Sequence, residues 1–301
     1  VDVQKYSLEM DYNKLANAIT EKTKVVIPVD LGGVPCDYNR IFSIVESKKE
    51  LFHPVNKLQK AIGRVIVMTD AAHAFGAEWN GKAVGSIADF SNFSFHAVKN
   101  FTTAEGGAVT WKDIEGIDNE EIYHQYQLLS LHGQSKDALA KTQLGAWEYD
   151  IVGAWFKCNM TDVCAGIGLG QMRRYNQILT RRKEIINRYN TAFADLPLSA
   201  VTHYTDSYTS SGHLYIVKLD GCGAEQRDKF IENMAELGVA TNVHYKPLPM
   251  HTGYQKLGFR IEDYPMAYEQ FKNVVTLPLH TCLSDEDVDY VIECVGKCLE
   301  Q

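Results

Sequence analysis

The amino-acid sequence predicts an α/β fold, in which a large domain with a mostly parallel sheet is followed by a smaller α+β domain. Short apolar runs alternate with helical patterns through the first half of the chain, which is typical of a parallel sheet covered by helices. A long helical pattern begins at Thr161 and leads into further strands and helices. With 301 residues, 45% of them hydrophobic, the chain can bury a core in each of two domains. We expect these domains to span residues 1–160 and 161–301.

Four apolar runs supply the expected strands of the large domain, at residues 24–30, 63–70, 88–95 and 107–111. The first two runs end in aspartate, at Asp30 and Asp70. Ligands of open α/β sheets bind at the carboxyl ends of the strands. Asp70 is therefore a candidate site residue from its position alone.

The pattern over residues 161–193 predicts one long helix with Thr161 as its N-cap. A glycine inside a helix costs about 1 kcal/mol relative to alanine. This segment carries three near its start, Gly166, Gly168 and Gly170. We expect another backbone to approach closely there and to compensate for the cost.

The rest of the smaller domain is expected to alternate strands with helices. The strands are predicted at 213–219 and 239–245, and the helices at 225–238 and 284–300, with Ser284 as the N-cap of the last helix. One basic run, Arg181 to Lys183, lies in the long helical pattern and is expected to form a solvated face.

Composition excludes several classes of function. The formal net charge of −8 argues against nucleic-acid binding, which needs an excess of clustered Lys and Arg. No apolar run reaches the roughly 18 residues of a membrane span, and the N-terminus does not resemble a signal peptide. The seven cysteines are odd in number and form no CxxC pair, which favours a reducing cytoplasm. We expect a cytoplasmic protein with neither a membrane nor a nucleic-acid partner.

No metal site is expected either. Cys294 and Cys298 are four residues apart on a predicted helix, a spacing that favours small buried thiols over a metal clip. His124 and His132 do not have the spacing of metal ligands.

Two stretches, DAAHAFGA at 70–77 and SFHAVKN at 94–100, can converge above one sheet edge. Pyridoxal phosphate needs an amine for its aldehyde, an anion against its ring nitrogen and donors for its phosphate. Lys99, Asp70 and Ser94 supply one of each. Alternatives remain open for some of these residues: Asp70 as a helix cap, Ser94 as an ordinary strand hydroxyl and His73 as a core histidine.

Several ordered motifs carry a family resemblance, namely DAAHAFGA, GSIADFSNFSFHAVKNFTTAEGGAV, KCNMTDVCAGIGLGQMRR, NVHYKPLPMHTGY and VTLPLHTCLSDEDVDYVI. In this order they resemble the DegT/DnrJ/EryC1/StrS family of sugar aminotransferases, from about Val1 to the last helix. The resemblance implies the fold of fold-type-I pyridoxal-phosphate enzymes and a homodimer with shared active sites. It also implies transfer of an amino group from an amino acid, by family habit glutamate, to a nucleotide-linked keto sugar for amino-sugar or cell-surface polysaccharide synthesis. The segment NVHYKPLP favours amination at sugar C4 over C3.

The resemblance also assigns roles to residues. Lys99 matches the lysine that binds the cofactor covalently, Asp70 the partner of the pyridine nitrogen, His73 the residue beside the cofactor ring and Ser94 a phosphate ligand. Asn159 lies in the segment that reaches the neighbouring subunit's phosphate site, with Lys157 as its rival.

Family members carry some eighty or more residues before the segment that begins this chain, so we expect an N-terminal part of the cofactor site to be missing here. His244 and Tyr245 either contact substrate or form a structural loop. Two other functions stay open: a cysteine desulfurase, which needs a reactive loop cysteine, and a catalytically inactive regulatory member of the family.

Overall fold

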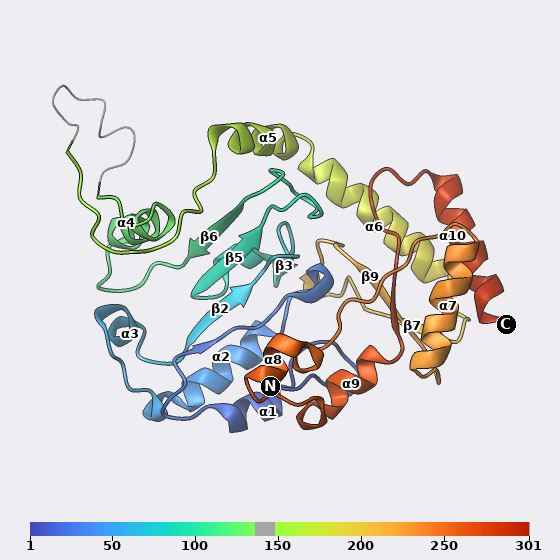
Figure 1. The fold of residues 1–301 in the computed structure, drawn as a ribbon, viewed down its shortest axis with the longest axis horizontal. Helices are drawn as coiled ribbons and strands as arrows, with labels where there is room; N and C mark the ends of the chain where they lie inside the picture. Colours follow the sequence, from blue (N-terminus) through green and yellow to red (C-terminus); the bar gives the residue numbers. More distant parts are fainter. Residues whose placement is uncertain (136–147, 301) are drawn as a thin grey trace.

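The computed structural model describes residues 1–135 and 148–300. Its central element is a four-stranded sheet, which can be followed in Figure 1. The strands lie in the order β1-β2-β5-β6 and are β1 (Val25–Val26), β2 (Ile66–Asp70), β5 (Phe90–Ser94) and β6 (Gly107–Trp111). The first three are parallel, and β6 runs antiparallel to β5. The predicted mostly parallel sheet is thus confirmed, although the run at 24–30 gives a strand of only two residues.

Helices from the first half of the chain accompany this sheet, namely α1 (Tyr12–Ala18), α2 (Tyr38–Ser47), α3 (Lys57–Ile62) and α4 (Asn119–Ser130). Asp37 is the N-cap of α2, and its side chain accepts a hydrogen bond from the Arg40 backbone N–H. Its buried residues Tyr38, Ile41 and Val45 recur at helical spacing. They join the residues of β1 and β2 in one hydrophobic core, so α2 covers one face of the sheet.

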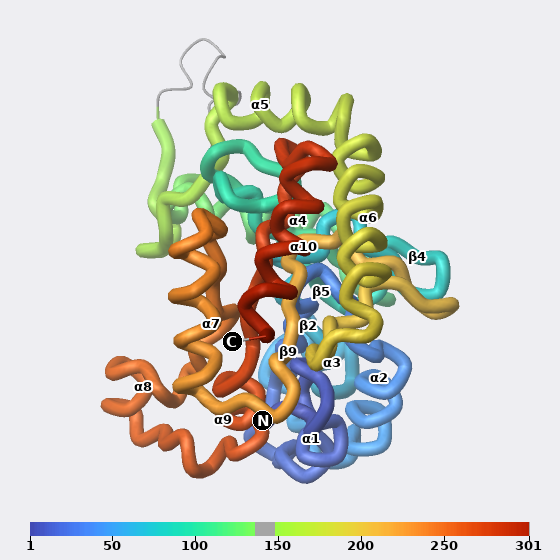
Figure 2. Tube along the Cα trace, turned by 90° about the vertical axis from the view of Figure 1, so that its right-hand side faces the viewer, coloured from blue at the N-terminus to red at the C-terminus, as the bar shows by residue number. Residues whose placement is uncertain are grey.

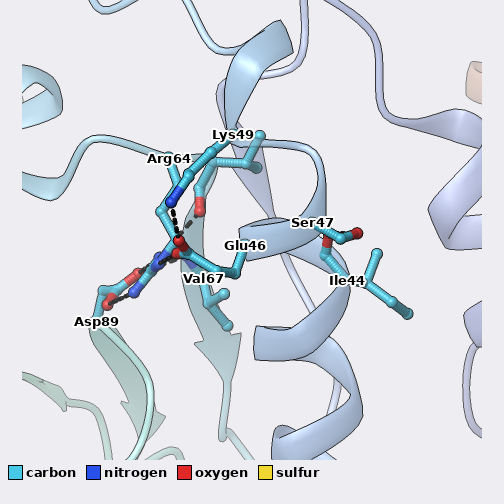
Figure 3. A network of polar contacts seen from close by, with 8 residues as sticks. Ile44, Glu46, Ser47, Lys49, Arg64, Val67 and Asp89 are labelled. Atoms are coloured by element: carbon cyan, nitrogen blue, oxygen red, sulfur yellow. Dashed lines mark hydrogen bonds and ion pairs between the residues drawn. The ribbon is translucent and has the colours of Figure 1, made fainter.

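An ion pair fixes the edge of the sheet at which β2 and β5 begin (Figure 3). The Arg64 guanidinium donates to both carboxylate oxygens of Asp89, at 2.7 and 2.9 Å. Asp89 Oδ2 also accepts a hydrogen bond from the Val67 backbone N–H at 2.9 Å. A bidentate pair of this kind sets geometry as well as adding energy. It holds the two strands in register at the edge opposite Asp70.

The expected long helix over 161–193 is in fact two helices, α5 (Asp162–Met172) and α6 (Tyr175–Ala192). The backbone leaves helical geometry at Arg174. Tyr175 is buried and donates through its hydroxyl to the Phe75 carbonyl, so tertiary packing sets where α6 begins. Thr161 is the N-cap of α5 as predicted, and its hydroxyl accepts from the Cys164 N–H.

Within the described residues of the single chain, no other backbone approaches the glycines of α5, so the predicted close approach stays a prediction for the dimer. A Cβ on Gly168 would lie 2.9 Å from Thr103 Cγ2, so a side chain rather than a backbone approaches this position. A Cβ on Gly166 or Gly170 would meet nothing within 4 Å. Much of the apolar surface of α5, including Val163 and Leu169, is exposed in the single chain.

The basic run is not wholly a solvated face, because Arg182 is only 7% exposed. Its position in α6 falls on the buried stripe formed by Ile178, Ile185, Ile186 and Tyr189, which explains the wrong prediction. The guanidinium donates to the carbonyls of three residues, Gly212, His213 and Leu279. Burial lowers the pKa of Arg182 to about 10.

A second, antiparallel sheet belongs to the C-terminal half, with strands in the order β10-β9-β7: β10 (Val274–Leu277), β9 (Tyr215–Leu219) and β7 (Leu198–Ala200). Helices α6, α7 (Ala224–Glu236) and α10 (Asp285–Leu299) share its core, and Figure 2 shows them side by side. Ser284 caps α10 as predicted, in a reciprocal pair with Asp287. Cys294 and Cys298 are buried free thiols, also as predicted.

The predicted strand over 239–245 does not form. Asn242 makes one isolated bridge to Thr276, and the chain then turns away from the sheet. The ring of Tyr245 lies against a histidine of the first half instead. The strand prediction for this stretch is therefore wrong, because contacts with distant segments hold it as a loop.

The remaining α-helices and strands of the described residues are α8 (Thr252–Lys256), α9 (Pro265–Phe271), β3 (Glu78–Trp79), β4 (Lys82–Ala83) and β8 (Tyr208–Thr209). The short sheet β4-β3-β8 pairs residues of the two halves of the chain. A division at residue 160 stays a proposal. Among residues 1–135 and 148–300, none of the helices has the length and hydropathy of a membrane span. The same residues contain no group of three or more His, Cys, Asp or Glu side chains that could bind a metal ion.

A buried carboxyl group gives the fold a testable pH dependence. Asp30 is fully buried and accepts hydrogen bonds from the Tyr38 hydroxyl at 2.6 Å and the Cys36 N–H at 2.9 Å. Burial raises the pKa of Asp30 to about 6, above its ordinary value of 3.8. The folded state therefore binds the carboxyl proton of Asp30 more tightly than the unfolded state does. Protonated Asp30 stabilises the folded state at low pH, and this stabilisation is lost as the pH rises through 6.

Because of Asp30, we expect the free energy of unfolding to fall by about 1 kcal/mol between pH 5 and pH 7. The measurement is urea unfolding at both pH values for the parent and for Asp30→Asn, since the difference between the two proteins removes the contributions of other groups. An identical pH dependence in both proteins would show that Asp30 is ionised throughout this range.

Candidate active site

Lys99 lies in the loop of residues 95–106 that joins β5 to β6. Backbone hydrogen bonds from Phe95 to Gly106 and from Thr103 to Phe95 hold the two ends of the loop together. Asp70 pairs with Asn92 across the parallel strands β2 and β5. The carboxyl ends of these two strands therefore lie at one edge of the sheet, and Lys99 follows directly beyond it.

The amine of Lys99 is partly withdrawn from water. Burial lowers the pKa of Lys99, and the attraction of the nearby Asp70 carboxylate opposes this shift only in part. More of the amine is therefore neutral near pH 7 than in an exposed lysine. A neutral amine is the form that acts as nucleophile or base.

Asp70 ends β2 and is half-buried. Its Oδ1 accepts a hydrogen bond from the Ala72 N–H at 3.1 Å, across a turn. No helix starts there, so the helix-cap alternative is wrong. This hydrogen bond to a residue two positions later holds the carboxylate at the edge of the sheet.

His73 is neutral and its tautomer is fixed. The Gly32 N–H donates to Nδ1 at 3.1 Å, so the ring proton must lie on Nε2, which is 3.2 Å from the Tyr245 hydroxyl. Burial, aided by the charges of Lys99 and His244, lowers the pKa of His73 to about 3. The ring is thus a neutral surface that donates to Tyr245.

His213 is a site residue that sequence reasoning missed. Its ring centroid is 4.2 Å from that of His73, and its Nδ1 is 3.0 Å from Oδ1 of Asn100. Burial lowers the pKa of His213 to about 2, with His73 and Arg182 adding to the effect. The only sequence signal was a histidine at the start of the run HLYIVKL, which gave no reason to place it beside residue 73.

The other predicted residues are placed less centrally. Ser94 ends β5, and its Oγ accepts from the His96 N–H at 3.4 Å. Asn159 is exposed and accepts a hydrogen bond from Lys157. Met160 next to it packs on the aromatic cluster under the Lys99 loop, so this segment passes beside the loop without bringing Asn159 to Asp70 or His73.

Of the two undecided residues, Tyr245 lies at the site. Its ring is 6.1 Å from the His73 ring and stacked on it, and the side chain remains 49% exposed. His244 pairs through Nδ1 with Thr276 Oγ1 at 2.9 Å, and Lys99 lowers its pKa further than burial alone. The segment therefore closes one side of the group formed by Asp70, His73, Lys99 and His213.

Comparison with known proteins decides the family. The model of the DegT/DnrJ/EryC1/StrS aminotransferase family matches residues 1–296. The chain belongs to this family. The chain is also similar to the spore coat polysaccharide biosynthesis protein SpsC of Bacillus subtilis, which is 35% identical over 298 residues, covering 98% of this chain and 71% of SpsC.

Two solved structures show how closely the fold agrees. Spr1654 of Streptococcus pneumoniae, assigned as a sugar aminotransferase and solved in its PMP form, superposes with a TM-score of 0.97 at 54% identity, over 100% of this chain and 75% of that one. PseC of Helicobacter pylori, an aminotransferase of pseudaminic acid biosynthesis, superposes with a TM-score of 0.81 at 26% identity, over 97% of this chain and 71% of PseC.

Membership of the DegT/DnrJ/EryC1/StrS family makes this chain a pyridoxal-phosphate-dependent aminotransferase of fold type I. It decides against the cysteine desulfurase. The donor set at the sheet edge fits the cofactor: a lysine amine with a lowered pKa, a carboxylate at a strand end, a neutral imidazole and a strand-end hydroxyl.

Proposed function

We propose that this aminotransferase moves an amino group from glutamate to a keto sugar carried by a nucleotide. The observation that carries the proposal is the half-buried Lys99 amine beside the Asp70 carboxylate, at one edge of the sheet. The relatives add the substrate class, because SpsC is a polysaccharide biosynthesis protein and Spr1654 is assigned as a sugar aminotransferase. We further propose a role in amino-sugar synthesis for a cell-surface polysaccharide.

Four residues would hold the cofactor. Lys99 would bind its aldehyde, Asp70 would face its ring nitrogen, His73 would lie beside its ring and Ser94 would bind its phosphate. When bound, pyridoxal phosphate supplies an aldehyde that carries the amino group and a ring that withdraws electrons.

The chain's own part in the chemistry rests on Lys99 and Asp70. The lone pair of the neutral Lys99 Nζ accepts the proton that leaves the α-carbon of glutamate, and Nζ later returns a proton to the sugar carbon that receives the amine. Asp70 is a fixed negative charge that stabilises a proton on the group opposite it. The neutral rings of His73 and His213 add no positive charge that would compete with this proton.

Assembly and location complete the proposal. We propose a homodimer in which Asn159, or Lys157 beside it, reaches the phosphate site of the neighbouring subunit. The exposed position of both side chains leaves them available for such a contact. We also propose a cytoplasmic location, which the seven free cysteines support.

The substrate is tested by a screen of UDP-, dTDP-, GDP- and CMP-linked 3-keto and 4-keto sugars with glutamate as donor. We expect a 4-keto sugar to be aminated, with 2-oxoglutarate formed in equal amount. Turnover of 3-keto sugars alone would overturn the preference for C4. Absence of turnover with every sugar by cofactor-loaded enzyme would count against sugar amination.

A further inference from the structure

Asn100 follows Lys99 directly, and its side chain is buried, with the residue 9% exposed. Its Nδ2 donates to the Ser211 carbonyl at 2.8 Å, and its Oδ1 lies 3.0 Å from His213 Nδ1. Both partners belong to the second half of the chain. The residue next to the reactive amine is therefore anchored to a segment that is distant in sequence.

The chemistry of these contacts leaves one arrangement of protons. A carbonyl oxygen can only accept, so the amide nitrogen of Asn100 must face Ser211 and the amide oxygen must face His213. His213 must then carry its proton on Nδ1 and donate it. Burial favours this neutral form of the ring, and the positive charges of Arg182 and Lys99 add to the effect.

The segment around His213 is itself held from several sides. Arg182 donates to the carbonyls of Gly212 and His213, and the Ser211 hydroxyl donates to the His73 carbonyl. Gly33 packs so closely that a Cβ there would lie 2.1 Å from Ser211 Oγ. Because residues 211–213 are held in place by these contacts, they can in turn hold the Asn100 side chain that is hydrogen-bonded to them.

We propose that Asn100 and His213 act as positioning residues that hold Lys99 in its partly buried place at the sheet edge. The pair acts through the backbone of Asn100. The side chain of Asn100 is held by hydrogen bonds, and this fixes the position of Lys99, the preceding residue. This inference rests on the proposed role of Lys99. It assigns function to two residues that need not touch cofactor or substrate.

The test measures Lys99 itself in cofactor-free enzyme. Competitive labelling with acetic anhydride, followed by mass spectrometry of the peptide that contains Lys99, reports the reactivity and pKa of the amine. In Asn100→Ala and His213→Ala the lysine moves into water and its pKa rises, so labelling at pH 8 should fall about tenfold for one pKa unit. His213→Asn keeps a donor near the Nδ1 position and should label like the parent.

Met234→Ala is the control for lost stability. Met234 is fully buried in the core of the second half of the chain. The substitution should lower the melting temperature and leave Lys99 labelling unchanged. Parental labelling in the two alanine variants, or equal losses in Met234→Ala or His213→Asn, would overturn the inference. Should Asn100→Ala not fold, the His213 pair decides alone.

Failure of this inference is separate from failure of the proposed function. Full activity in a Lys99 variant would remove the proposed function. Unchanged Lys99 reactivity in the Asn100 and His213 variants would remove only the positioning role.

Discussion

Lys99→Ala is expected to abolish amino transfer. The substitution removes both the amine that would bind the cofactor and the base that would move the substrate proton. If catalysis falls to the uncatalysed rate, the loss is at least about 10⁶-fold, or about 8 kcal/mol of transition-state stabilisation. The measurement is formation of 2-oxoglutarate from glutamate under single-turnover conditions, which detects even one transfer per active site.

Lys112→Ala is the control for this result. Lys112 directly follows β6 and is, like Lys99, a lysine whose pKa is lowered by burial. Its charge interacts with Asp89 and Arg64 at the opposite edge of the sheet, so its loss should leave amino transfer intact. Turnover by Lys99→Ala above the level of contaminating enzyme would refute the assignment of the catalytic lysine.

Asp70→Asn should leave the cofactor bound and slow proton transfer by about 10²- to 10⁴-fold, the range typical of a lost acid–base contribution. The asparagine oxygen can still accept the Ala72 N–H, so the turn after β2 is retained. The negative charge opposite the cofactor ring is lost. Rapid-reaction absorbance measures the proton-transfer step apart from cofactor binding.

Asp89→Asn provides the matching carboxylate control at the other end of the same strands. It weakens the pair with Arg64 and should lower stability, while the proton-transfer rate stays at the parental value. A parental rate in Asp70→Asn would show that this carboxylate has only the structural role of closing its turn.

The parts of the fold that depend on local periodicity could be predicted from the sequence. Short apolar runs predicted strands β2, β5 and β6, and a helical pattern of residues predicted α10. The end of β2 also gave Asp70. Lys99 was found because a lysine is unusual in a stretch of aromatic residues and glycines, which suggested a functional role.

What could not be predicted depends on contacts between distant segments. The division between α5 and α6 follows from the packing of Tyr175 under Phe75, a hundred positions earlier. Arg182 lies on the buried face of α6, at a position where the helical spacing calls for an apolar residue. Its burial is explained only by the backbone carbonyls that accept its hydrogen bonds. His213 enters the site because β9 begins beside the turn at Gly32, which no local pattern records.

The anchoring of Asn100 also has a consequence for how the enzyme is made. Asn100 contacts Ser211 and His213, which lie 111 and 113 positions later in the chain. Domains form from the N-terminal end during synthesis, so β2 and β5 can pair on the ribosome while these partners have yet to emerge. The lysine loop then lacks the contacts that Asn100 makes with Ser211 and His213. A nascent chain that stops before residue 213 would carry the sheet and Lys99 without these contacts, so we expect the cofactor to bind late in biosynthesis.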